Sequence, residues 1–449
     1  MKLTDHLIVL SFDCLSSLDI PHLRELPHFQ AFFAKASYCT NVTTIYPSVT
    51  YPCHTTIVTG KYPKNHGIIN NTLLQPGVSS PDWYWRRSHI RGTTLYDEAK
   101  KAGMKTAALL WPVTARAKID YNLPEIFANR PWHNQIAVSL CNGSPLYQLE
   151  MNQRFGHIRK GLNQPELDDF VLKSAVHTIK AKKPDLMLIH FVDLDSQRHA
   201  HGFSSRQAME ALHRHDRRLG ETIEALQDAG IYENSTVILL GDHSALDETV
   251  AIKPNVLFRE HGLIQVTGQG KVSDWKAYCK SCDGSAYVYL KDPSDTETCR
   301  IVKDLLHSLT EDAEQGIEWV LTGQQAAEIG ADGDAAFMIE ARLGFYIKES
   351  LEGAYRDQVT EEAVTDKKYT WASHGYSPKK ENYKTVFMAA GKGIRQNVVL
   401  PAMHLADEGP TFARLLGLSL GRTDGRVLEE ILENSREGYT LEKVYERRE

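Results

Sequence analysis

The chain has 449 residues, of which 42% are hydrophobic and 24% charged, an ordinary balance for a globular protein. This length exceeds that of a typical single-core domain, which predicts one large domain with an inserted lobe, or two domains. The net charge of −6 provides no polycationic surface, so we expect neither a nucleic-acid polymer nor a membrane as a partner, although a nucleotide could still be a substrate.

The first apolar run, residues 7–12, has only six residues and is followed at once by Asp13. No small-residue cleavage site of a signal peptide follows it. No stretch approaches the roughly 20 apolar residues of a spanning helix. The seven cysteines, an odd number at scattered positions, are typical of free thiols in a reducing compartment. Unless processing removed a leader, we expect a cytoplasmic protein; its oligomeric state stays open.

Short apolar runs alternate with amphipathic segments, which predicts an α/β fold with a mostly parallel sheet flanked by helices. A helix is expected just after Thr50, through residue 59. A longer one is expected from Ser205 to Ala229, where apolar residues recur at spacings of three and four. Ser204 and Gln207 resemble its capping box, and Asp216 is expected to be buried and bonded to backbone. The expected core strands are 7–12, 105–110, 185–190, 236–240 and 385–390.

Residues 246–369 differ in composition from the rest of the chain. They contain a predicted strand with alternating aromatic residues at 284–290, a helix near 298–309 and a second strand at 344–348. We interpret this segment as an inserted, smaller α+β lobe. Residues 1–245 and 370–449 would then form one catalytic domain.

Candidate site residues follow several of the predicted strands. Asp13 comes directly after the first strand, and Asp242 closely follows the strand at 236–240. Functional sites in open α/β sheets lie at the carboxyl ends of the strands, so these positions can converge. Asp195 and His199 are four residues apart, and one helical turn would place both on the same face.

A second group of candidates lies outside these strand ends. His243 and His374 add imidazoles, and Thr50 adds a hydroxyl at the start of a predicted helix, whose N-terminus would face a bound phosphate. The whole set comprises three carboxylates, three imidazoles and one hydroxyl. This is enough to bind two divalent metals with a nucleophile between them.

The order of these residues resembles that of the alkaline phosphatase superfamily, and its type I phosphodiesterase/nucleotide pyrophosphatase family in particular. The stretch from Thr50 to Asn71 is similar to the signature of that family almost throughout. Further similarities are Trp111-Pro112 and the segment 410–418. The resemblance covers residues 1 to about 245 and 370 to 425. It implies an alkaline-phosphatase-like fold and a metal-dependent hydrolase of phosphodiester or pyrophosphate bonds.

The resemblance also implies roles for individual residues. Thr50 would be the nucleophile and form a phosphothreonine, Asn71 would bind phosphate, and Tyr51 would help to stack a base. The two metals would be Zn²⁺, with Mn²⁺ as the alternative. One metal would be held by Asp195, His199 and His374, and the other by Asp13, Thr50, Asp242 and His243.

The substrate is left open by departures from the family's pattern. His190 stands where nucleotide-hydrolysing relatives often have Tyr, and Cys53 stands where many have Asn. The cluster at 83–87, of aromatic and basic residues, could cap a ligand or be ordinary packing. The alternatives are a phosphomonoesterase or phosphonate hydrolase on the same site, a phosphosugar mutase, and a non-catalytic binder. No Arg or Lys flanks Thr50 directly, which favours a diesterase, because a dianionic monoester needs more positive charge.

Overall fold

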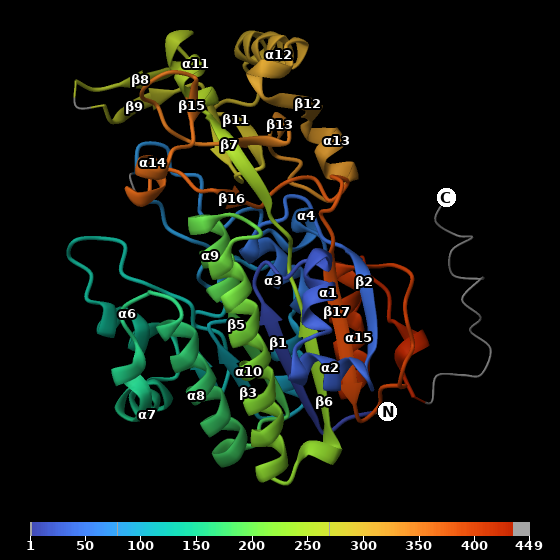
Figure 1. Cartoon of the computed structure of the whole chain (residues 1–449). Helices are drawn as coiled ribbons and strands as arrows, with labels where there is room; N and C mark the ends of the chain where they lie inside the picture. Colours follow the sequence, from blue (N-terminus) through green and yellow to red (C-terminus); the bar gives the residue numbers. More distant parts are fainter. Residues whose placement is uncertain (1, 79, 269, 434–449) are drawn as a thin grey trace.

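A mixed eight-stranded sheet forms the centre of the larger body of the molecule (Figure 1). The computed structural model describes residues 2–78, 80–268 and 270–433. Five adjacent strands run parallel to one another, whereas the strand on the other side of the first of them runs antiparallel to both of its neighbours. These strands are β6 (Ser235–Leu240), β1 (His6–Phe12), β5 (Leu186–Phe191), β3 (Thr106–Leu109) and β4 (Tyr121–Leu123), followed on the other side of β6 by β17 (Thr385–Gly391), β2 (Ser37–Thr43) and β18 (Met403–His404).

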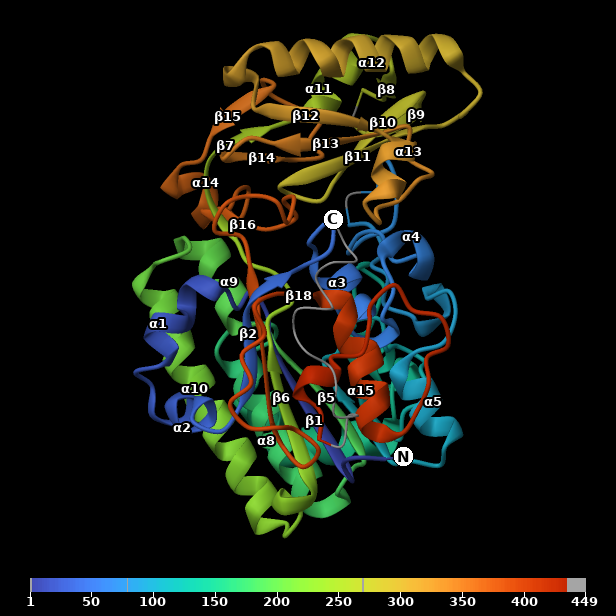
Figure 2. The same ribbon diagram turned by 90° about the vertical axis from the view of Figure 1, so that its right-hand side faces the viewer.

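The central strand β1 shows why this sheet is covered on both faces. Side chains alternate between the faces of a strand, so an entirely apolar strand needs two cores. Ile8 and Leu10 belong to one buried cluster, and Leu7 and Val9 belong to the other. The first cluster is closed by helices α2 (Pro27–Phe33), α8 (Glu166–Lys182) and α10 (Arg206–Asp228), and the second by α3 (Thr50–Thr59), α5 (Leu95–Lys101) and α15 (Glu408–Leu416) (Figure 2).

The long helix α10 begins one residue later than the sequence pattern suggests. Its N-cap is Ser205, whose hydroxyl accepts a hydrogen bond from the Ala208 N–H, so the predicted cap at Ser204 is wrong. Asp216 accepts hydrogen bonds from the backbone N–H groups of His28 and Phe29. Its prediction as a buried, backbone-bonded residue is confirmed.

The segment 246–369, here called the lobe, forms separate sheets above the main one (Figure 2). The predicted strand at 344–348 pairs with β7 and not with the strand at 285–290. The division into a catalytic domain and a lobe stays a prediction, and residues 434–449 lie outside the described residues. One antiparallel sheet contains β10 (Ala277–Ser281), β11 (Ser285–Leu290), β13 (Phe337–Ala341) and β12 (Ile317–Thr322), with α12 (Thr296–Glu311) packed against β12, and another contains β14 (Gly344–Ile347), β7 (Leu246–Ile252) and β15 (Arg356–Gln358).

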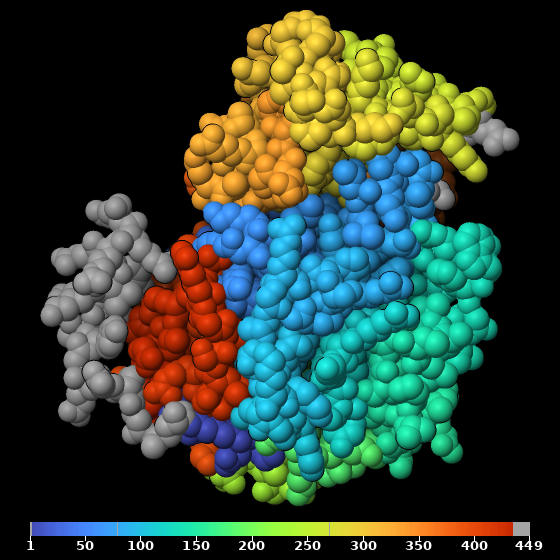
Figure 3. Space-filling model, turned by 180° about the vertical axis from the view of Figure 1, so that it is seen from behind, coloured from blue at the N-terminus to red at the C-terminus, as the bar shows by residue number. Residues whose placement is uncertain are grey.

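The lobe contacts the N-terminal part of the main body, as the space-filling view shows (Figure 3). The Lys64 N–H donates to the Gly330 carbonyl, and the Asn70 side chain donates to the Ser281 carbonyl. Within the described ranges, no helix is both long and apolar enough to span a bilayer. The remaining elements include α1 (Ile20–Leu23), α4 (Pro63–His66), α6 (Gln135–Asn142), α7 (Pro145–Phe155), α9 (Asp193–His201), α11 (Pro254–Glu260), α13 (Gly323–Glu328), α14 (Glu361–Thr365), β8 (Ile264–Val266), β9 (Val272–Trp275) and β16 (Ala372–Ser373).

Candidate active site

The candidate residues converge at the carboxyl ends of the parallel strands. Asp13 follows β1, α9 starts just after β5, and Asp242 follows β6 after one glycine. That glycine, Gly241, is required by the close approach of neighbouring chain segments. A Cβ there would lie 2.2 Å from the Leu15 carbonyl oxygen. Parallel neighbours end at the same edge of the sheet, so residues far apart in the sequence meet there.

The first group of candidate metal ligands contains Asp13, Asp242 and His243, whose ligand atoms lie within 4.8 Å of one another. His243 Nε2 is 3.4 Å from Asp13 Oδ1 and 3.2 Å from Asp242 Oδ2. Both of these carboxylate oxygens are buried and have no hydrogen-bond partner. Burial raises the pKa of Asp242 to about 7, and burial together with the charge of Asp242 raises the pKa of Asp13. Two buried carboxylates this close need a compensating positive charge, which a divalent cation would supply.

The second group contains Asp195, His199 and His374. Helix α9 places His199 Nε2 3.2 Å from Asp195 Oδ2, as the spacing of four residues predicts. His199 Nδ1 lies 2.8 Å from the Ala372 carbonyl, a hydrogen bond that directs Nε2 toward Asp195. Although burial opposes it, Asp195 raises the pKa of His199 to about 10. The two groups adjoin, since the rings of His243 and His374 have centroids 4.1 Å apart.

Thr50 is the first residue of helix α3, and its hydroxyl oxygen lies 3.3 Å from His243 Nε2. N–H groups in the first turn of a helix have no partner within the helix, so this end suits an anion. His54, one turn further on, pairs through Nδ1 with the Thr50 carbonyl at 2.8 Å and through Nε2 with the Ser11 hydroxyl at 2.9 Å. These bonds tie the start of α3 to strand β1.

Asn71 and Tyr51 are linked by a hydrogen bond that the sequence did not predict. The Tyr51 N–H donates to Asn71 Oδ1 at 2.8 Å. The Tyr51 N–H is therefore occupied, and the Asn71 Nδ2 group is left as the donor for a phosphate oxygen. The Tyr51 ring is fully buried and packs edge-to-face against Trp83, with ring centroids 5.1 Å apart. The more accessible of the two rings belongs to Trp83.

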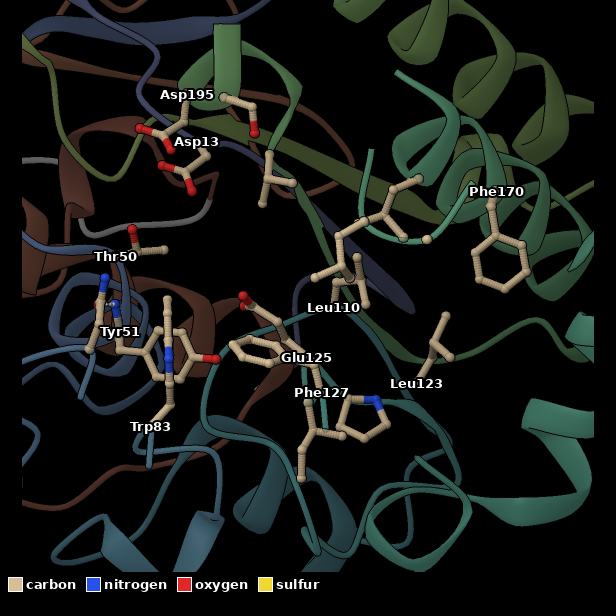
Figure 4. A pocket seen from close by; sticks show the side chains of 18 of the residues that line it. Asp13, Thr50, Tyr51, Trp83, Leu110, Leu123, Glu125, Phe127, Phe170 and Asp195 are labelled. Atoms are coloured by element: carbon tan, nitrogen blue, oxygen red, sulfur yellow. Dashed lines mark hydrogen bonds between the residues drawn. The ribbon is translucent and has the colours of Figure 1, made fainter. Parts of the chain in front are cut away.

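A cavity of about 720 Å³ opens onto the site (Figure 4). Its lining includes Asp13 of the first ligand group and Asp195, His199 and His374 of the second. Asp13, Thr50 and Asp195 lie at the polar end, and Leu123 and Phe170 lie in the apolar remainder. The residues of the cluster at 83–87 divide between the two roles considered for it, which are contact with a ligand and ordinary packing. Trp83 lines the cavity, Trp85 is buried and Arg87 is bound to Asp97.

Comparison with known proteins identifies the family. The family model "Type I phosphodiesterase / nucleotide pyrophosphatase" matches residues 7–377. The chain belongs to this family. Over 218 residues, 46% of the chain, it is 25% identical to human ectonucleotide pyrophosphatase/phosphodiesterase family member 1. Over 210 residues, 44% of the chain, it is 27% identical to venom phosphodiesterase 2 of Crotalus adamanteus. These matches span only 20% and 22% of the two relatives, about a fifth of their length.

Solved structures of the family have the same fold. The murine ectonucleotide pyrophosphatase/phosphodiesterase 5 aligns with 96% of this chain and 100% of its own, with a TM-score of 0.65 and 20% identity. The human protein of the same name gives a TM-score of 0.66 at 19% identity. The expected alkaline-phosphatase-like α/β fold is thus confirmed.

Within this family fold, the lobe supports the loops that carry the site. Glu340 on β13 is buried and accepts hydrogen bonds from the Tyr46 hydroxyl and the Ser377 N–H. Tyr46 lies four residues before Thr50, and Ser377 lies three residues after His374. One carboxyl group of the lobe therefore anchors both the loop before Thr50 and the loop after His374.

This anchor should make stability depend on pH. Burial raises the pKa of Glu340 to about 8, even though Lys380 opposes the shift. As the pH rises from about 4.5 toward 8, the unfolded chain loses the proton of Glu340 before the folded chain does, so the free energy of unfolding falls. Glu340→Gln cannot ionise. Between pH 5.5 and 8.5, the free energy of unfolding of wild type, measured with urea, should fall by about 2 kcal/mol relative to that of this variant.

The control for this prediction is Glu311→Gln, which changes an exposed glutamate at the end of α12. It should keep the pH dependence of wild type. Parallel pH profiles for wild type and Glu340→Gln would contradict the anchor described above.

Two cavity residues escaped prediction from the sequence. Glu125 follows β4, a strand of three residues that is too short to produce a recognisable pattern. Asp283 lies in the turn between β10 and β11 of the lobe, and reaches the cavity only because the lobe packs over the site. A carboxylate directly after an apolar Leu-Pro pair was the only signal for Glu125, and it is a weak one.

Proposed function

We propose that the chain hydrolyses phosphodiester or pyrophosphate bonds with Thr50 as the nucleophile. The observation that carries this proposal is the position of the Thr50 hydroxyl, 3.3 Å from His243 Nε2 at the N-terminus of α3. A hydroxyl next to two groups of candidate metal ligands, with helix N–H groups beside it, has the surroundings that stabilise an alkoxide and a bound phosphate.

The donor set fits two divalent metal ions. Asp13, Asp195 and Asp242 each have a buried carboxylate oxygen without a hydrogen-bond partner. Mixed His and carboxylate coordination suits Zn²⁺, and Mn²⁺ is the alternative. When bound, such ions lower the pKa of a coordinated hydroxyl and offset negative charge on the oxygens of the reacting phosphate. One ion would be held by Asp195, His199 and His374, and the other by Asp13, Asp242, His243 and Thr50.

The residues of the chain then act in two displacements. Thr50 Oγ loses its proton to water and attacks phosphorus, and the bond to the leaving oxygen breaks. The leaving group departs as an alcohol or a phosphate, protonated by water where its pKa requires it, and a phosphothreonine remains. Water then attacks this ester from the side that the leaving group has vacated, opposite Thr50 Oγ, and releases Thr50 and the phosphate product. Asn71 Nδ2 and the Thr50 N–H, at the start of α3, donate to non-bridging oxygens. Two in-line displacements give net retention of configuration at phosphorus.

The substrate class is the finer part of the proposal. An inactive form of murine ectonucleotide pyrophosphatase/phosphodiesterase 5 has been solved in complex with AMP, which supports a nucleotide as a candidate. In this chain Trp83 is the more accessible aromatic surface for a base, since the Tyr51 ring is buried. The cytoplasmic location expected from the sequence stays a prediction.

A panel of three chromogenic substrates tests this function. Zinc-loaded protein is assayed with bis(p-nitrophenyl) phosphate, a nucleoside 5′-monophosphate p-nitrophenyl ester and p-nitrophenyl phosphate. We expect the highest kcat/KM for a diester, and a gain with the nucleoside ester if a base is bound. Preference for the monoester would instead assign a phosphomonoesterase. No turnover of any of the three would overturn the proposal and favour a phosphonate hydrolase, a mutase or a binding protein.

A further inference from the structure

Glu125 is a half-buried acidic residue of the cavity for which the proposed mechanism has no use. Its Oε2 atom is inaccessible to solvent and has no hydrogen-bond partner. This oxygen lies 3.8 Å from His190 Nδ1, and His190 Nε2 lies 3.1 Å from Asp13 Oδ2. One imidazole ring thus separates Glu125 from a candidate metal ligand. Figure 4 shows the carboxyl group turned into the cavity between Tyr51 and Leu110.

The charges that line this cavity are unbalanced. Its acidic side chains are Asp13, Glu125, Asp195 and Asp283, and Arg159 is the single Arg or Lys among the described residues of its lining. Arg159 lies at the apolar end of the cavity, where its guanidinium donates to Asn152 and lies over the Phe170 ring. Two divalent ions would offset the acidic ligands themselves. No lysine or arginine of the lining is then left to offset Glu125.

We infer that Glu125 is a specificity-determining residue, which disfavours doubly charged phosphate monoesters and so selects singly charged diesters. The inference rests on the proposed function, whose site it shares. A carboxylate in a partly enclosed cavity repels a dianion more strongly than a monoanion, because the effective dielectric constant is well below that of water. The uncharged second ester group of a diester can instead lie against the neighbouring apolar wall, which includes Leu123, Ile126 and Phe127.

The test compares selectivity and not activity alone. For each protein, kcat/KM is measured for bis(p-nitrophenyl) phosphate and for p-nitrophenyl phosphate on the same preparation, so differences in metal content cancel in the ratio. The assay is run at pH 9, because burial raises the pKa of Glu125 to about 7 and the carboxyl must be ionised. In Glu125→Gln the diester-to-monoester ratio should fall roughly tenfold or more.

Two further variants separate charge from structure. Glu125→Asp keeps the charge and should retain a ratio within roughly threefold of wild type. Glu233→Gln makes the same chemical change at an exposed residue just before β6, at the opposite end of the strands from the site, and should leave the ratio unchanged. An unchanged ratio in Glu125→Gln, with folding intact by circular dichroism, would overturn the inference.

A binding measurement makes the inference independent of turnover. Calorimetry at pH 9 compares inorganic phosphate, a dianion, with dimethyl phosphate, a monoanion, on zinc-loaded protein. Glu125→Gln should bind phosphate roughly tenfold more tightly and dimethyl phosphate about as before. If wild type turns over no ester but shows this change in binding, the proposed function fails, and Glu125 discriminates between a dianion and a monoanion in binding alone. If diesters are hydrolysed and neither ratio nor affinity changes, only the inference fails.

Discussion

Replacing Thr50 by alanine is expected to lower kcat for a phosphodiester by at least about a thousandfold. The hydroxyl is the atom that would bond to phosphorus, and no other hydroxyl is as close to His243 Nε2 among the hydrogen bonds of the described residues. The side chain is small and its neighbours need not move, so the thermal midpoint should change by no more than about 4 °C. Steady-state kinetics and differential scanning calorimetry measure both quantities.

Thr55→Ala is the matched control for this substitution. Thr55 is also buried in α3, but its hydroxyl donates to the Tyr51 carbonyl inside the helix and faces no ligand group. This variant should keep kcat within a few-fold of wild type. Thr50→Ser should retain measurable turnover, because it keeps a nucleophilic oxygen. Inversion at phosphorus with a chiral phosphorothioate diester would contradict a covalent intermediate even if Thr50→Ala is inactive.

Removing one ligand from either metal group is expected to release one of two bound ions. His374→Ala acts on the group with Asp195 and His199, and Asp242→Ala acts on the group with Asp13 and His243. In each variant the content measured by plasma mass spectrometry should fall from about two ions per chain to about one, because too few donors remain around one ion. The kcat for a diester should fall by about a thousandfold, since both displacements use the two ions together.

Two residues near the motifs provide matched controls. His201 is two positions after His199, and Asp247 is five positions after Asp242; both are exposed and lie outside the ligand groups. His201→Ala and Asp247→Asn should keep two ions. An unaltered metal content in His374→Ala or Asp242→Ala would remove that residue from the ligand set.

Local sequence was sufficient to predict the elements that carry the site. The strands at 7–12 and 236–240 are apolar except for Ser11 and Thr236, and an aspartate or a Gly-Asp pair follows each of them, so the edge of the sheet could be located without coordinates. The pair Asp195 and His199 needed only the pitch of one helical turn. The direction of β17 could not be predicted in this way, because an apolar strand has the same pattern in either direction.

Long-range packing decided the remaining features of the site. Glu340 and Asp283 come from the lobe, more than two hundred residues after Thr50, and their positions depend on how the sheets of the lobe settle on the main body. The hydrogen bond between Tyr51 and Asn71, and the burial of the Tyr51 ring behind Trp83, likewise depend on loops that have no repeating pattern.

The sequence by itself identified the candidate ligands, the candidate hydroxyl and the strands that bring them to one edge. Such information is local, because it depends on residue type and on spacing within single elements. Only the tertiary structure decided which further charges lie close to these residues. The half-buried carboxyl of Glu125 faces Asp13 across His190, three residues that belong to three different strand ends. Charge repulsion depends on distance in space, which spacing along the chain does not encode.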